Sequence, residues 1–130
     1  MRGYVLFVED DDFIRQTYAE DLRKAGLIVQ EETSTSHALD VLSSGLPGVI
    51  LLNLEMPANR ISGIEMLVRL RNVPEWAHIP VVVLSKLSDV VNPDVMARLN
   101  VSTVLSKTLR SDEVVRLIGD VLQREGGELR

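Results

Sequence analysis

The chain has 130 residues, which suits one compact domain, and we expect a single domain over residues 1–130 with its core over about 3–123. The absence of cysteine excludes disulfides and thiolate metal sites, and the net charge of −5 disfavours direct binding of nucleic acid, whose phosphates would repel it. No apolar run reaches the roughly 18 residues of a membrane span and the acidic start is unlike a signal peptide, so we expect a cytoplasmic protein without membrane contact.

Five apolar runs have the length of β-strands. Three of them are near-continuous and rich in Val, Leu and Ile, which is typical of strands buried on both faces of a parallel sheet. The second run is the least regular, because charged residues lie close on both sides of it. In chain order the runs are Tyr4–Val8, Leu27–Val29, Val49–Leu52, Val81–Leu84 and Thr103–Leu105.

Segments with the apolar period of a helix follow each run. Asp11 or Asp12 can cap the first helix, and Gly26 follows it as a residue that tolerates positive φ. The Ser34–Ser36 stretch offers N-caps for the second helix, which Gly45 closes.

The third helix is expected over about Ile64–Leu70 and the fourth over about Asn92–Leu99. Pro93 suits the first turn of the fourth helix, and Asn100 can take the left-handed conformation at its end. Ser111 is expected to cap the fifth helix.

Strand and helix therefore alternate five times. This order predicts an α/β fold with a doubly wound five-stranded parallel sheet of the flavodoxin-like type, covered by helices on both faces. Ligand chemistry in such a fold is found where the carboxyl ends of the strands meet. Residues 124–130, which include Gly126-Gly127, are expected to be a frayed tail.

Polar residues follow four of the five strands. They are Glu9–Asp12 after the first, Asn53 and Glu55 after the third, Ser85 after the fourth and Lys107 after the fifth. The acids also suit the N-terminal turn of a helix, a lone serine is commonly a turn residue, and a lone lysine is commonly solvated. His37 and His78 have no second ligand at metal spacing.

Four stretches together resemble the receiver domain of two-component response regulators. They are VLFVEDDDFIRQTYAEDLRKAG, VILLNLEMP, HIPVVVLS and VLSK, which stand in the order of that family and extend the resemblance over nearly the whole chain. None of the four motifs is specific alone, but together, in this order and each at the end of a strand, they are a strong signal.

The resemblance implies a metal site. Glu9 and Asp10 match the acidic pair that holds Mg²⁺ in the family, and Glu55 matches the residue whose backbone carbonyl also ligates the ion. Hard oxygen ligands of this kind suit Mg²⁺.

The resemblance also implies a phosphoryl site. Asn53 matches the aspartate that accepts the phosphoryl group from a histidine kinase or phosphotransfer protein. Ser85 matches the hydroxyl that hydrogen-bonds that group, and Lys107 matches the lysine that pairs with one of its oxygens. Because an amide oxygen is a very poor nucleophile, no acyl phosphate is expected at Asn53. The loss of one negative charge also predicts weak Mg²⁺ binding.

Four further positions depart from the family pattern. The loop from Met56 to Gly63 is longer, Val104 replaces a common aromatic, Thr108 replaces a proline, and Lys86 replaces a small residue. Asn53 is therefore either the natural residue of a pseudo-receiver or an engineered change in a working one.

The leading hypothesis is a signalling receiver module that is not an enzyme, has no organic cofactor and acts through protein contacts. The resemblance implies that the fourth helix, fifth strand and fifth helix form the surface for an output protein or a homodimer. The alternatives are an ordinary phospho-accepting receiver with an engineered Asn53, and a flavodoxin-like ligand-binding domain. The last is weakened by the acids that stand where a glycine-rich phosphate loop would be.

Overall fold

The computed structural model describes residues 3–86, 91–107 and 109–127. Its strands are β1 (Val5–Val8), β2 (Val29–Glu32), β3 (Val49–Asn53), β4 (Val81–Ser85) and β5 (Thr103–Ser106). Its helices are α1 (Asp12–Lys24), α2 (Thr35–Leu42), α3 (Gly63–Asn72), α4 (Pro93–Arg98) and α5 (Ser111–Gly127). The strands pair in parallel in the order β2-β1-β3-β4-β5, which confirms the predicted doubly wound fold.

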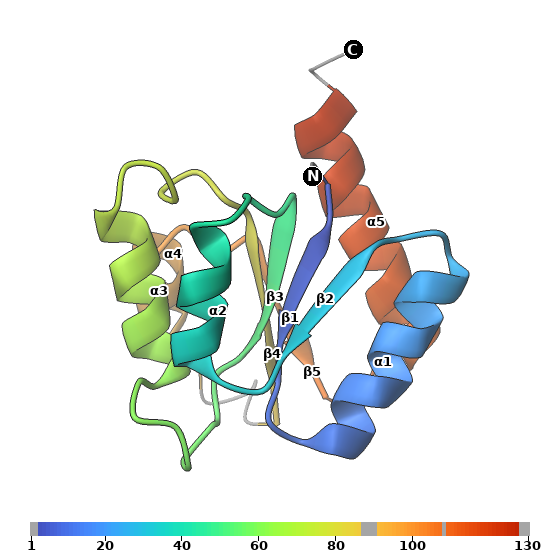
Figure 1. Ribbon diagram of the computed structural model, residues 1–130, viewed down its shortest axis with the longest axis horizontal. Helices are drawn as coiled ribbons and strands as arrows, with labels where there is room; N and C mark the ends of the chain where they lie inside the picture. The colour runs from blue at the N-terminus through green and yellow to red at the C-terminus, as the bar shows by residue number, and fades with distance from the viewer. Residues whose placement is uncertain (1–2, 87–90, 108, 128–130) are drawn as a thin grey trace.

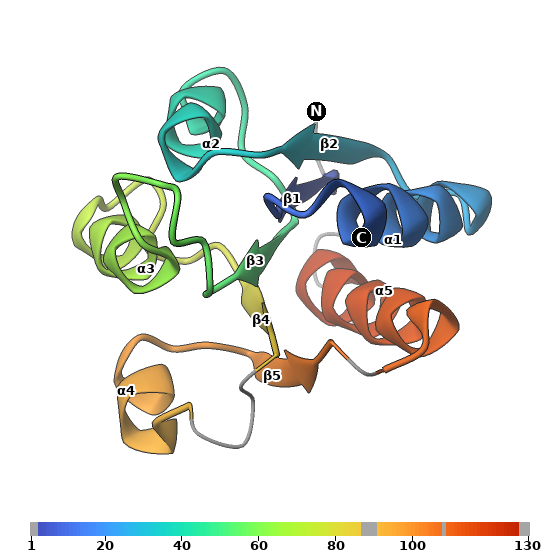
Figure 2. The ribbon, with the colours of Figure 1, turned by 90° about the horizontal axis from the view of Figure 1, so that it is seen from below.

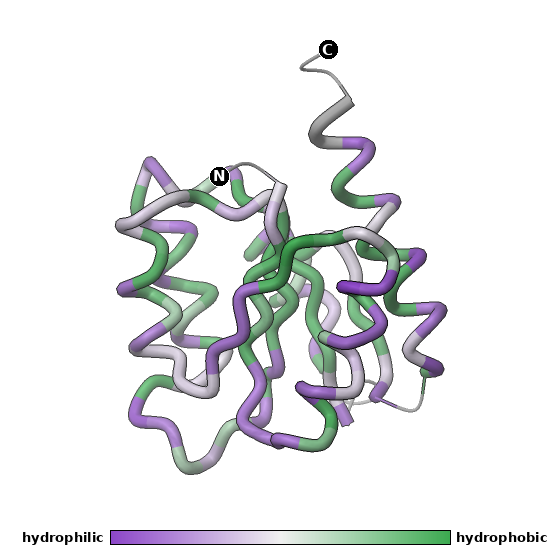
Figure 3. The backbone as a smooth tube through the Cα atoms, turned by 45° about the vertical axis from the view of Figure 1, so that its right-hand side comes forward, coloured by the Kyte–Doolittle hydropathy of each residue, from purple (hydrophilic) through white to green (hydrophobic). Residues whose placement is uncertain are grey.

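The helices cover both faces of the sheet: α1 and α5 lie on one side, and α2, α3 and α4 lie on the other (Figure 1). Since successive strand residues point to opposite faces, each strand supplies both layers of the core. Leu6 and Ile50 pack toward α2, α3 and α4, whereas Phe7 and Leu51 pack toward α1 and α5. Figure 3 shows the apolar residues gathered along the strands.

Most predicted helix ends are confirmed. Asp11 caps α1 by accepting the Ile14 backbone N–H at 2.9 Å, and Gly26 follows the helix with a φ of 90°. Pro93 lies in the first turn of α4 as predicted, and Asn92, expected as part of the helix, precedes it as the cap. The predicted left-handed residue after α4, Asn100, has a φ of 53°.

The predicted position of the second strand was wrong, because β2 spans Val29–Glu32 and not Leu27–Val29. Three of its four residues are polar, and β2 lies at the edge of the sheet, where one side reaches solvent. Arg15 and Arg23 of α1 both pair with Glu31. Ion pairs between α1 and β2 thus stabilise a strand that an apolar run does not reveal.

The predicted start of the fifth helix was also wrong in detail. Ser111 is the first residue of α5, and its hydroxyl donates to the Asp21 carboxylate of α1 instead of capping the helix. Helix α5 extends to Gly127, and the frayed tail expected over residues 124–130 stays a prediction. Residues 128–130 lie outside the described part. Among the described residues no helix combines the length and apolar character needed to cross a bilayer.

The first residue of α3 packs directly against the end of β3. A Cβ atom on Gly63 would lie 2.7 Å from the Leu54 Cα and 2.8 Å from the Asn53 carbonyl oxygen. Both are backbone atoms, which cannot turn aside. This close approach fixes where β3 ends relative to α3.

We therefore expect Gly63→Ala to lower the free energy of unfolding by about 2 kcal/mol, the usual size of an overpacking penalty. Gly119→Ala in α5 is the matched control, since nothing lies within 4 Å of its added Cβ, and it should be neutral or stabilising. Urea unfolding of both variants measures the difference. A Gly63→Ala variant as stable as the wild type would contradict the close packing.

Candidate functional site

The predicted site residues meet at the edge formed by the carboxyl ends of the strands, which Figure 2 views from below. Glu9 follows β1, Asn53 ends β3, Ser85 ends β4 and Lys107 follows β5. Glu9 and Ser85 are fully buried and Asn53 is 1% exposed, so these polar groups lie beneath the loops. The structure thus brings together residues that are up to 98 positions apart in sequence, between Glu9 and Lys107.

A buried ion pair joins β1 to β5. Lys107 Nζ lies 2.8 Å from Glu9 Oε1, and the two side chains are 5% and 0% exposed. Glu9 Oε1 has no other polar partner in the described part of the chain, so the Lys107 ammonium alone offsets its burial. Burial raises the pKa of Glu9, and Lys107 offsets only part of the rise.

The Asn53 side-chain amide lies at the centre of the site. Its Nδ2 donates to Glu9 Oε2 at 2.9 Å, to the Glu55 carbonyl oxygen at 2.8 Å and to Asp10 Oδ1 at 3.4 Å. Its Oδ1 accepts from the Glu55 backbone N–H at 3.1 Å. The reverse orientation would place an oxygen against three oxygens, so these contacts fix the amide as described.

The Glu55 side chain connects β3 to β4, a contact that the sequence analysis missed. Glu55 Oε2 accepts from the Ser85 hydroxyl at 2.5 Å, and Oε1 accepts from the Lys86 backbone N–H at 2.9 Å. We expected only the Glu55 backbone to contribute to the site. No sequence pattern reveals this contact, because it depends on how the loops after two different strands approach each other.

Two side chains of α1 support the site from beneath, and neither stood out in the sequence. Arg15 is 8% exposed, and its Nη1 donates to the Glu9 carbonyl oxygen at 3.0 Å. The Tyr18 hydroxyl donates to the Leu109 carbonyl oxygen at 2.9 Å, and the Tyr18 ring stacks on Phe7. These contacts hold the segments that carry Glu9 and Lys107.

The extended loop between β3 and α3 is attached to the start of α2. Asn59 Oδ1 accepts from the Thr35 backbone N–H at 3.0 Å, and the Thr35 hydroxyl donates to the Ile61 carbonyl oxygen at 2.7 Å. Thr35 is fully buried. The loop that departs from the family pattern is thus packed against the domain.

The other residues that depart from the family pattern differ in burial. Val104 is half-buried and packs with the core layer beneath α2, α3 and α4, and Lys86 is exposed. His37 and His78 are exposed as well. The predicted departure at Thr108 lies outside the described residues.

The arrangement does not fit a metal ion as it stands. The Glu9 and Asp10 carboxylates and the Glu55 carbonyl, which the resemblance implies as ligands, converge on an amide N–H donor. A cation would need the lone pairs that this donor already uses. Within the described ranges no group of three or more acidic, histidine or cysteine side chains is placed to hold a metal.

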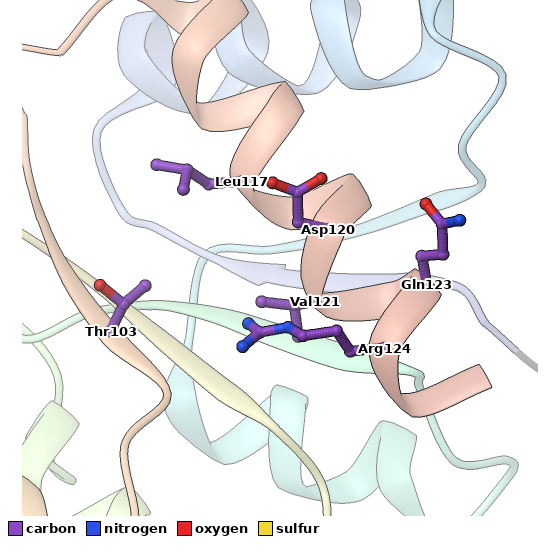
Figure 4. A pocket seen from close by; sticks show the side chains of 6 residues that line it. All are labelled: Thr103, Leu117, Asp120, Val121, Gln123 and Arg124. Atoms are coloured by element: carbon purple, nitrogen blue, oxygen red, sulfur yellow. The ribbon is translucent and has the colours of Figure 1, made fainter. Parts of the chain in front are cut away.

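A hollow of about 580 Å³ lies elsewhere, beside the first residue of β5 and the second half of α5 (Figure 4). It is at the opposite end of the strands from the site and contains none of the predicted site residues. Its lining residues are Thr103, Leu117, Asp120, Val121, Gln123 and Arg124.

Comparison with known proteins identifies the fold and the family. The sequence matches the response regulator receiver domain over residues 5–119. The transcriptional regulatory protein FixJ of Azorhizobium caulinodans is 29% identical over 126 residues, which are 95% of this chain and 56% of FixJ. The phosphate regulon transcriptional regulatory protein PhoB of Pseudomonas aeruginosa is 29% identical over 122 residues, 94% of this chain and 52% of PhoB.

Among solved structures, the receiver domain of the Francisella response regulator 1452 superposes with a TM-score of 0.83 at 24% identity, covering 94% of this chain and 98% of that one. This likeness shows the fold. The chain spans about half the length of FixJ and PhoB, the transcriptional regulators that it matches. The chain belongs to the receiver domain family of response regulators, the signalling modules of two-component systems.

Proposed function

We propose that this receiver domain acts through contacts with other proteins and carries no phosphoryl group while Asn53 stands at the acceptor position. The observation that carries the proposal is the Asn53 amide itself. Its oxygen accepts the Glu55 N–H and its nitrogen donates to Glu9, so the side chain is engaged at both ends and has no nucleophilic atom. Receiver domains are generally signalling modules without enzymatic activity, and we propose the same for this chain.

The partners are proposed from the family. Receiver domains interact with histidine kinases or phosphotransfer proteins and with output domains. For this chain we propose that α4, β5 and α5 form the surface that meets an output protein or a second copy. Support comes from β5, which is an edge strand, and from α4 and α5, which lie on opposite faces beside it.

Metal binding is proposed to be weak. Glu9, Asp10 and the Glu55 carbonyl are the oxygens that Mg²⁺ would use, but the ion would first have to displace the Asn53 amide that bridges them. The competing proposal is an ordinary receiver with an engineered Asn53. It is supported by the position of Glu9, which accepts from the Asn53 amide and pairs with Lys107, so both groups lie close to residue 53.

The protein should gain no mass on incubation with acetyl phosphate and Mg²⁺. Without a carboxylate at residue 53, no oxygen there can displace acetate from phosphorus. Intact mass spectrometry measures the result, with a receiver that retains its aspartate as the positive control. A phosphoryl adduct that hydroxylamine removes would overturn the proposal.

A further inference from the structure

The contacts of the site form a closed sequence. Beginning at β3, the Asn53 amide donates to Glu9, and Glu9 pairs with Lys107. The Lys107 backbone N–H donates to the Ser85 carbonyl oxygen at 3.1 Å. The Ser85 hydroxyl donates to Glu55, whose backbone N–H donates back to the Asn53 oxygen. Five residues thus connect the ends of β1, β3, β4 and β5 in a ring made only of the chain's own groups.

The ring needs a side chain at residue 53 that both donates and accepts hydrogen bonds. One side of the residue must donate to the Glu9 carboxylate, and the other must accept from the Glu55 N–H. A side-chain amide has both functions, whereas an aspartate carboxylate only accepts. With aspartate, the contact to Glu9 would become a repulsion between two carboxylates.

The Glu55 carboxylate closes the ring at the end of β4. The Ser85 hydroxyl and the Lys86 N–H are two donors that point at the two oxygens of one carboxylate. Hydrogen bonds to a charged acceptor are the stronger kind. The Glu55 carboxylate is therefore the anion that these two donors bind. In the same way, the Asn53 amide is the donor that the surrounding oxygens bind.

We propose that this ring holds the four strand ends in one arrangement without a metal ion or a phosphoryl group, and that Glu55 is the positioning residue that closes it. The inference rests on the proposed function and extends it, because it gives a reason why a module that is not phosphorylated keeps Glu9, Ser85 and Lys107. It also makes Asn53 a working part of the site.

The test compares amide hydrogen exchange and backbone chemical shifts of the 130-residue protein with those of Glu55→Ala and Glu55→Gln variants. Glu55→Ala removes both acceptors, so the Lys86 amide should exchange at least about tenfold faster, a loss of roughly 1.4 kcal/mol in protection. The amide shifts of Lys107 and Glu9 should change as well, because the ring passes the change on. Glu55→Gln keeps one acceptor oxygen and should lose less protection.

Glu65→Ala is the matched control. Glu65 is an exposed acid of α3 that pairs with Arg69, so its removal should change shifts within α3 alone. Unchanged Lys86 exchange in Glu55→Ala would overturn the role of Glu55. Shift changes that stop at Ser85 and Lys86 would overturn the ring. Glu55→Gln gives the same comparison if Glu55→Ala does not fold, and none of these readouts depends on whether the protein accepts a phosphoryl group.

Discussion

An Asn53→Asp variant is expected to lose about 3 kcal/mol of stability in the presence of a chelator. The substitution removes the N–H donor that Glu9 and Asp10 share and adds a third negative charge beside them. Glu9 is fully buried, so solvent cannot screen the repulsion. The three carboxylates then resemble a cation site, and Mg²⁺ should restore much of the loss.

Urea unfolding in chelator and in Mg²⁺ measures this dependence. Asn92→Asp serves as the control, because the exposed Asn92 side chain accepts from the Asp94 and Val95 N–H groups, which a carboxylate can also do, so the change should have a small effect that Mg²⁺ does not alter. Equal stability of the Asn53→Asp variant and the wild type in chelator would show that the amide has no special part in the site.

Phosphorylation of the same Asn53→Asp variant is expected to be slow or absent even in Mg²⁺. The Ser85 hydroxyl and the Lys86 N–H are both engaged by Glu55, so the donors that would stabilise a phosphoryl group must first be released. Val104 also provides no aromatic side chain to reorient. Large beryllofluoride-induced amide shifts across Val91–Leu122 would show an intact switch and favour the engineered origin of Asn53.

A Lys107→Met variant is expected to be destabilised by about 3–5 kcal/mol near pH 8, because removing one partner leaves the other charge buried alone. Burial already raises the pKa of Glu9, and Lys107 offsets part of that rise. Without the Lys107 ammonium, the pKa of Glu9 should rise further. A raised folded-state pKa means that the folded protein holds the proton more tightly than the unfolded chain. The loss should therefore shrink as the pH falls from about 8 to about 5.

Denaturant unfolding at several pH values measures this trend, and adding Glu9→Gln to Lys107→Met should recover part of the stability at pH 8. Lys24→Met is the control: Lys24 pairs with Glu20 on the surface, where both side chains are largely exposed, and no measurable loss is expected. A loss in Lys107→Met that stays constant with pH would mean that Glu9 is not the group left unpaired.

The fold class could be predicted from the amino-acid sequence, and so could the polar groups that meet at the carboxyl edge of the sheet. Near-continuous apolar runs such as Val49–Leu52 and Val81–Leu84 identify strands covered on both faces, and capping residues such as Asp11 and Ser34 mark helix starts. These signals are local, so they can be read without the structure. Since parallel strands end at one edge, the same reading placed Glu9, Ser85 and Lys107 together.

Other features depend on contacts between segments that are distant in the sequence, and they become visible only in the folded chain. The polar strand β2 pairs with β1 and its Glu31 meets Arg15 and Arg23 of α1, and Ser111 turns from its expected cap toward Asp21. The Glu55 carboxylate reaches Ser85 only because the loops after β3 and β4 meet. Side-chain hydrogen bonds across such distances leave no periodic pattern in the sequence, and their geometry is set by packing. Which polar groups meet at this edge was predictable from the sequence, whereas their hydrogen bonds to one another follow from the packing of the loops.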